Sequence, residues 1–198
     1  IRAFHGLLAA GIVLGLWRLV APARQLVTRV ALVTAAIVIG TSLWSPRPLL
    51  VGLAALVLTL QVVQGLRPRW WLVPLFWVWV NSHGSFALGL ALVGAVAVGA
   101  AVDQRRWWPR TEAGACLAAG SGALLGTLNP LGWRLLWFPV ELLRRGGSLR
   151  RVAEWRAPAF PSVPEQVLLL LLALIVLAAS RRASWRQLVP ALAFFVAG

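Results

Sequence analysis

Long apolar runs recur along the whole chain, and they constrain its fold more than any other feature of the sequence. Eight runs are separated by stretches that contain Arg, Pro and Trp, and they cover residues 3–20, 27–44, 49–65, 70–81, 85–102, 112–128, 165–180 and 187 to the end. Roughly 20 consecutive apolar residues form a helix that crosses the hydrocarbon core of a bilayer. We therefore predict an all-α fold, in which these segments form a polytopic transmembrane bundle that is a single domain over residues 1–198.

The composition argues against a water-soluble domain. The chain is 60% hydrophobic and 12% charged, with a mean hydropathy of +0.83, whereas soluble domains are about 25% charged. Several runs are short, and the shortest, 70–81, contains Pro74. Short or broken helices are tolerated in a membrane where their ends face protein or a water-filled cavity. The bundle is therefore expected to contain interrupted helices.

The ends of the sequence and its single cysteine add two further expectations. The chain contains no Met, and its last apolar run stops at Gly198. We expect it to be an internal slice of a larger protein, so that the missing remainder of the chain is itself a partner. Cys116 stands alone, and no disulfide or cysteine metal motif is predicted. The sequence contains no cofactor-binding motif, and it leaves open whether the protein binds a divalent cation.

Arginine supplies all of the positive charge and predicts the orientation of the bundle. The net charge is +14, with nineteen arginines and no lysine. Eleven arginines lie in the odd-numbered connections between runs, against two elsewhere once the long connection 129–164 is left out. Because short cytoplasmic loops are enriched in arginine, we predict that the odd-numbered connections are cytoplasmic in an integral plasma (inner) membrane protein. The arginines punctuate apolar runs and form no continuous stripe, which excludes nucleic-acid binding.

This orientation places the polar stretches of the sequence together on the extracytoplasmic side. They are SPRP (45–48), NSHGS (81–85), NPLGW (129–133) and AEWRAPAF (153–160). Within the connection 129–164, aromatic residues alternate with arginines over 132–145. This pattern predicts an amphipathic helix that lies in the membrane interface, in contact with membrane lipids.

Each polar residue of these stretches has a structural and a functional interpretation. Asn81 is a good helix cap, whereas His83 caps poorly and suits a hydrogen-bond, acid–base or phosphate contact. Arg47 is either an interface arginine or a forked donor for a phosphate. Glu154 suits an ion pair with neighbouring arginines, and Trp155 could stack on a sugar ring. His5, near the outer end of the first run, is the weakest candidate.

The order of these motifs resembles a known group of membrane enzymes. The chain resembles bacterial multi-pass proteins related to the GT-C glycosyltransferases, which use polyprenyl-phosphate-sugar donors. The resemblance lies in four motifs in order: SPRP before an apolar run, WVWVNSHGSFALG, LNPLGW and EWRAPAF. The resemblance covers about Arg47 to Phe160. It implies transfer of a sugar from a lipid-linked phosphate donor on the extracytoplasmic side, in the cell envelope. By position, the recurring motif residues of the group are matched by Asn81, His83, Asn129, Glu154 and Trp155.

The resemblance leaves the catalytic residue unassigned. In GT-C enzymes the catalytic carboxylate usually lies in the first outer loop, and this sequence begins after it. Two other functions stay open: a transporter or lipid-handling protein, and an inactive assembly subunit. A transporter would more often place its polar groups at the middle of the spans.

For the NSHGS stretch we predict a helix break on the wall of an outward-facing cavity. The next helix would direct free N–H groups and its positive dipole end at an anion. His83 would add a donor, Gly84 would allow close approach, and Arg47 would supply formal charge for a phosphate.

The orientation can be tested by labelling introduced cysteines. In a Cys116→Ala background, Arg67→Cys, Arg105→Cys and Arg182→Cys should resist membrane-impermeant thiol reagents in intact cells, and Ser148→Cys should react. The reverse pattern would invert the orientation.

Overall fold

The described part of the chain is built from helices. The computed structural model describes residues 2–40, 48–144 and 183–197, together with positions 163, 166, 167, 169–171 and 173. Its elements are α1 (Arg2–Leu19), α2 (Leu26–Ile39), α3 (Leu49–Val63), the 3-10 helix η2 (Arg69–Trp71), α4 (Leu72–Ser82), α5 (Phe86–Gln104), α6 (Arg110–Leu125), α7 (Arg134–Arg144) and α10 (Trp185–Ala197). No strand occurs in these ranges. The predicted all-α class is therefore confirmed.

Most of the apolar runs correspond to helices with similar bounds. Five of the helices, α1, α3, α4, α5 and α6, begin and end within a few residues of the predicted runs. α2 is shorter than expected, since it ends at Ile39 and Gly40 caps it. Pro74 does not break α4, because it lies in the first turn, where its missing N–H would have no acceptor. The run 165–180 lies mostly outside the described residues.

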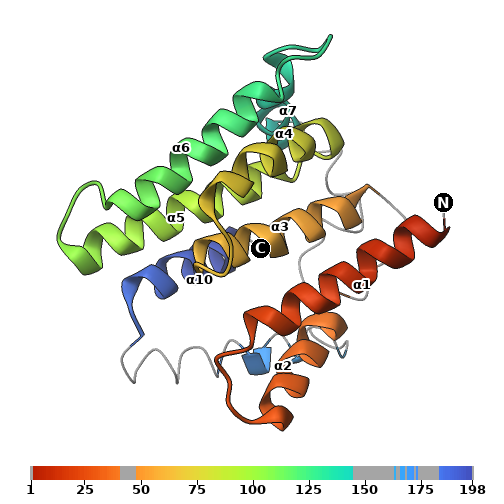
Figure 1. The fold of residues 1–198 in the computed structure, drawn as a ribbon, viewed down its shortest axis with the longest axis vertical. Helices are drawn as coiled ribbons and strands as arrows, with labels where there is room; N and C mark the ends of the chain where they lie inside the picture. The colour runs from red at the N-terminus through yellow and green to blue at the C-terminus, as the bar shows by residue number, and fades with distance from the viewer. Residues whose placement is uncertain are drawn as a thin grey trace.

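From α3 to α6, helices that follow one another along the chain alternate in direction, so the bundle has two ends (Figure 1). Glycines of α6 show that it runs alongside α4 in the same direction: Gly114 faces Arg69, Gly122 faces Val73 and Gly126 faces Val80. α3 and α5 run the opposite way. We call the end at which α4 and α6 finish the polar end, since it carries Asn81, His83 and Asn129. The end at which α3 and α5 finish is the basic end, with Arg67, Arg69, Arg105 and Arg186.

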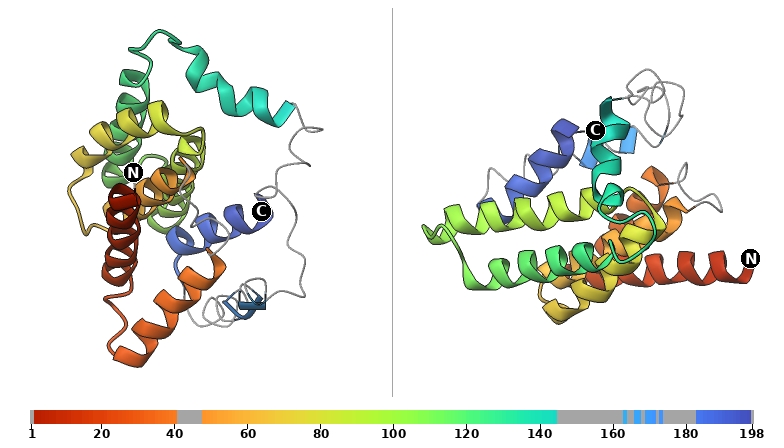
Figure 2. Two further views of the ribbon diagram at one scale, coloured as in Figure 1. Left: turned by 90° about the vertical axis from the view of Figure 1, so that its right-hand side faces the viewer. Right: turned by 90° about the horizontal axis from the view of Figure 1, so that it is seen from above.

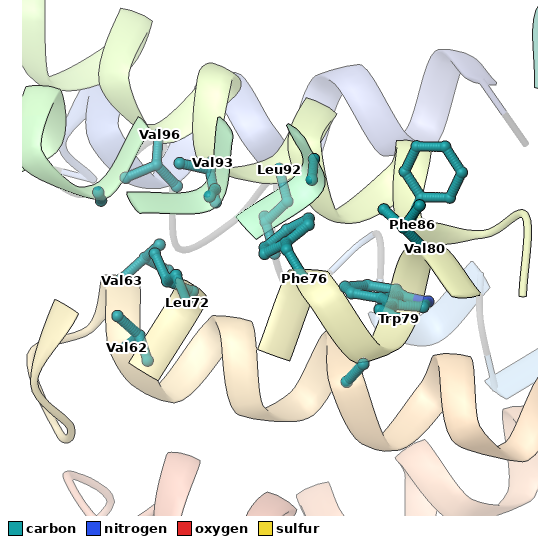
Figure 3. Close-up of a cluster of buried hydrophobic side chains, with 14 residues drawn as sticks. Val62, Val63, Leu72, Phe76, Trp79, Val80, Phe86, Leu92, Val93 and Val96 are labelled. Atoms are coloured by element: carbon teal, nitrogen blue, oxygen red, sulfur yellow. The ribbon is translucent and has the colours of Figure 1, made fainter. Parts of the chain in front are cut away.

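The core lies where α3, α4, α5 and α6 meet, and α4 is at its centre (Figure 3). Phe76 and Trp79 of α4 are fully buried, and their ring centroids are 5.3 Å apart. α6 contributes small residues, Ala115, Ala119 and Ala123, which leave room for these rings. A second, smaller cluster of Ile12, Leu50 and Val57 joins α1 to α3.

The outer faces of the helices are apolar. Leu7, Val27, Leu117 and Leu124 are among the large apolar side chains that are more than half exposed. α5 is the one helix among the described residues that is long and apolar enough to cross a membrane. Ala3–Leu19, α2 and α3 are apolar but shorter. By length and composition, one of the predicted segments among the described residues is thus a full span, and the polytopic transmembrane bundle stays a prediction.

The amphipathic helix predicted over 132–145 is present as α7. It crosses the direction of α5 and α6 at the polar end (Figure 2). Trp137 and Phe138 are about half exposed on it, and Pro139 lies inside the helix. Its location in a membrane interface stays a prediction.

Two glycines of α6 provide a matched test of the helix packing. A Cβ at Gly122 would lie 2.3 Å from the backbone oxygen of Val73, whereas a Cβ at Gly120 would meet nothing within 4 Å. Gly122→Ala should therefore destabilise the protein by about 1–3 kcal/mol. Gly120→Ala should stabilise it by roughly 0.5–1 kcal/mol through helix propensity alone. Thermal unfolding of both variants in the same detergent measures the difference, and equal effects would contradict the close contact of α4 with α6.

Candidate functional site

The NSHGS stretch forms the break between α4 and α5, as predicted. α4 ends at Ser82 and α5 begins at Phe86, with His83 in an extended conformation between them. Ser85 is the centre of the break, because its Oγ accepts from Trp79 Nε1 at 3.0 Å and lies 2.9 Å from His83 Nδ1. A buried core residue therefore fixes the position of the polar turn.

The hydrogen bonds of the break define the tautomer of His83. The backbone N–H of Ser85 donates to His83 Nδ1 at 3.1 Å. Nδ1 is thus an acceptor, and in the neutral imidazole the proton resides on Nε2. The imidazole is half-buried, and Ser85 holds it on its Nδ1 side.

The start of α5 differs from the predicted anion site. The N–H groups of Phe86, Ala87 and Leu88 donate to the backbone oxygens of His83, Gly84 and Ser85. Two of these bonds are long, 3.3 Å for Phe86 and 3.5 Å for Ala87, whereas that of Leu88 is 3.0 Å. The expectation of free N–H groups is therefore wrong for these residues, because the turn itself supplies their acceptors. The dipole of α5 still favours negative charge near this turn.

Asn81 and Asn129 come together, although they are 48 residues apart. Asn129 Nδ2 donates to Asn81 Oδ1 at 2.9 Å, and both amides donate to the backbone oxygen of Gly126. The second hydrogen of Asn81 Nδ2 goes to Trp77 O at 2.8 Å. Asn129 Oδ1 accepts from the N–H groups of Leu131 and Gly132. Both donor hydrogens of each amide and both lone pairs of Asn129 Oδ1 are used, so this pair fastens the end of α4 to the end of α6.

α7 closes over the break. A Cβ at Gly84 would lie 3.1 Å from the ring of Phe138. The close approach predicted at Gly84 is thus made by an aromatic residue of the amphipathic helix. A Cβ at Gly52 would lie 2.3 Å from Ser85 Oγ, which places the start of α3 against the same turn.

Four predicted residues remain, and the structure describes one of them. Arg47, Glu154 and Trp155 lie outside the described residues. His5 lies in α1, where its ring stacks edge-on with Phe4 at 5.7 Å. Within the described ranges, no three His, Cys, Asp or Glu side chains come close enough to hold a metal ion.

A second polar cluster lies at the basic end, and the sequence analysis missed it. Arg186 Nε donates to Glu112 Oε1 at 3.0 Å, and its Nη2 donates to the backbone oxygen of Val63. Asp103 caps the start of α10 by accepting from the N–H groups of Trp185 and Arg186, both at 2.9 Å. An available signal was the position of Glu112 inside an apolar run, since ionisable residues there mark functional or paired groups.

No family model matches the chain, and neither a curated protein nor a solved structure matches it.

Proposed function

We propose that this chain is part of an integral-membrane protein of the glycosyltransferase type, which transfers a sugar from a lipid-linked phosphate donor on the extracytoplasmic side. The observation that carries the proposal is the separation of polar groups between the two ends. His83, Ser85, Asn81 and Asn129 gather at the α4–α5 break under α7. The arginines of the short loops gather at the other end.

The exposed apolar faces support the membrane part of the proposal. Among the described residues, side chains such as Leu7, Val98 and Leu117 are more than half exposed on the outer faces of their helices. Contiguous apolar surface of this kind is costly in water and favourable against acyl chains. α7 crosses the direction of α5 and α6 at the polar end (Figure 2), so it would lie parallel to the surface of a membrane that these helices span.

The polar side chains inside α3 favour a transferase over a transporter. Thr59 and Gln61 are fully buried, but Thr59 Oγ1 donates to Ala55 O and Gln61 Nε2 donates to Gly15 O. Gln61 Oε1 accepts from Arg67. Both side chains are thus used in packing among the described residues, whereas a transporter would use such groups near the centre of the bundle to hold its substrate.

In this function, His83 is the residue of the break that acts on the donor. Its imidazole would donate a hydrogen bond to a phosphate oxygen or to the leaving group, while Ser85 holds the ring in place. Asn81 and Asn129 keep the break and the following turn in position. Glu154, Trp155 and Arg47 are proposed contacts to the sugar and the phosphate.

The proposal is tested by variants of the break in the full-length protein. His83→Ala should lower sugar transfer from a polyprenyl-phosphate-sugar donor by roughly ten- to a thousand-fold, because one preorganised donor is lost. Ser82→Ala is the matched control: Ser82 is exposed, and its hydroxyl donates to Val78 O at 2.7 Å within its own helix. It should transfer sugar at the wild-type rate.

A third variant separates catalysis from folding. Asn129→Ala should lower the thermal midpoint, since it leaves Gly126 O and two turn N–H groups with fewer partners. A His83→Ala protein that transfers sugar at the wild-type rate, or that fails to fold, would show that His83 is structural and would contradict the proposal.

A further inference from the structure

A cavity of about 500 Å³ opens at the basic end, away from the site described above. It lies between the end of α3, the loop 64–69, the start of α6 and Arg186 of α10. The volume is within the range of cavities that hold small molecules, about 300–1,000 Å³. The polar residues that line it are Gln64, Arg67, Arg69, Thr111, Glu112 and Arg186.

One lining residue carries an unused acceptor. Glu112 is 5% exposed, and its Oε1 accepts from Arg186. Its Oε2 is buried and has no hydrogen-bond partner among the described residues. A buried charged oxygen without a donor is costly, and a ligand donor in the cavity would remove that cost.

The charged residues that line the cavity indicate which other chemical group the ligand carries. Glu112 is the one acidic residue of the lining, against the guanidinium groups of Arg67, Arg69 and Arg186. Arg67 is held in place, because its Nε donates to Gln61 Oε1 at 2.7 Å and its guanidinium lies 4.5 Å from the centre of the Trp71 ring. Arg69 Nη1 donates to Thr111 O at 3.3 Å. Fixed guanidinium forks suit a phosphate, and the excess positive charge disfavours an ammonium group as the donor to Glu112.

We propose that this cavity binds a small phosphorylated polyol. Arg67 and Arg69 hold the phosphate, and a hydroxyl of the ligand donates to Glu112 Oε2. The inference goes beyond the proposed function, because the cavity lies at the opposite end of the bundle from His83. The same chemistry is presented by a soluble polyol phosphate and by the glycerol-phosphate headgroup of phosphatidylglycerol.

The first test measures binding of two probes to the purified full-length protein in a non-ionic detergent. Glycerol 3-phosphate carries the phosphate and the hydroxyls, and methyl phosphate carries the phosphate alone. By isothermal titration calorimetry, glycerol 3-phosphate should bind about ten- to a hundred-fold more tightly, the gain expected from a hydroxyl bonded to a buried carboxylate. Equal affinities, or no binding of either probe, would overturn the proposal and leave water as the donor to Oε2.

Three variants test separately the hydroxyl contact at Glu112 and the phosphate contact at the arginines. Glu112→Gln replaces the acceptor Oε2 by a donor of the same size and should abolish the preference for glycerol 3-phosphate. Arg69→Gln keeps Glu112 and should weaken both probes about ten-fold, so the proposal stays testable if Glu112→Gln does not fold. Arg106→Gln is the charge-matched control, since Arg106 is exposed and lies outside the cavity lining. If Arg106→Gln weakens binding as much as Arg69→Gln, the effect is one of general charge and the site is refuted.

The same binding measurement in lipid nanodiscs distinguishes a lipid headgroup from a soluble ligand. If the natural ligand is a lipid headgroup, phosphatidylglycerol nanodiscs should suppress binding of glycerol 3-phosphate, and phosphatidylcholine nanodiscs should not. If it is a soluble solute, the affinity should be the same in both. Loss of binding in both lipids would contradict the proposal.

Discussion

Arg186 makes the contacts on which the arrangement of the basic end depends. Its guanidinium reaches Glu112 in α6 and the last carbonyl of α3, and its backbone N–H reaches Asp103 in α5. One residue of α10 therefore joins four helices. In apolar surroundings an unpaired charge is costly, and so are the backbone groups at the end of a helix when they have no hydrogen-bond partner. Arg186, Glu112, Asp103 and the helix ends that they contact therefore stabilise the bundle only when all of them are present. Removing Arg186 would leave the buried carboxylate of Glu112 without its donor, which is destabilising.

The same constraint explains the polar end. There the break between α4 and α5 exposes backbone groups that a continuous helix would satisfy. His83 Nδ1 accepts from the backbone N–H of Ser85, and the Asn81–Asn129 pair donates to the backbone oxygens of Trp77 and Gly126. Between the two ends the helices approach each other through glycine and alanine, and Trp79 fills the space opposite Gly89. Among the described residues, one hydrogen-bonded polar cluster lies at the break under α7 and another lies around Arg186 at the opposite end.

Local features were readable from the sequence, and distant pairings were not. Apolar runs bounded by Arg, Pro and Gly predicted the helices, and alternation of aromatic and basic residues predicted α7. The helix break at His83 followed from its polar neighbours. Asn81 with Asn129, and Glu112 with Arg186, are 48 and 74 residues apart. Periodicity describes which face of a helix is apolar and contains no information on which distant residue a polar group will meet. The prediction that the first N–H groups of α5 are free was wrong for a related reason. Their acceptors are backbone oxygens of the turn, and the sequence does not show the geometry of that turn.

The central claim is that the apolar outer faces of the bundle meet lipid between two polar ends. Leu117, 65% exposed near the middle of α6, lies on such a face. A nitroxide label on Leu117→Cys in a Cys116→Ala background, measured by power saturation in liposomes, reports collisions with oxygen and with a water-soluble nickel chelate. The account predicts frequent collisions with oxygen and rare collisions with the chelate, and the reverse for a label on Gln104→Cys at the basic end of α5. Frequent chelate collisions at position 117 would place that face in water and contradict the membrane bundle.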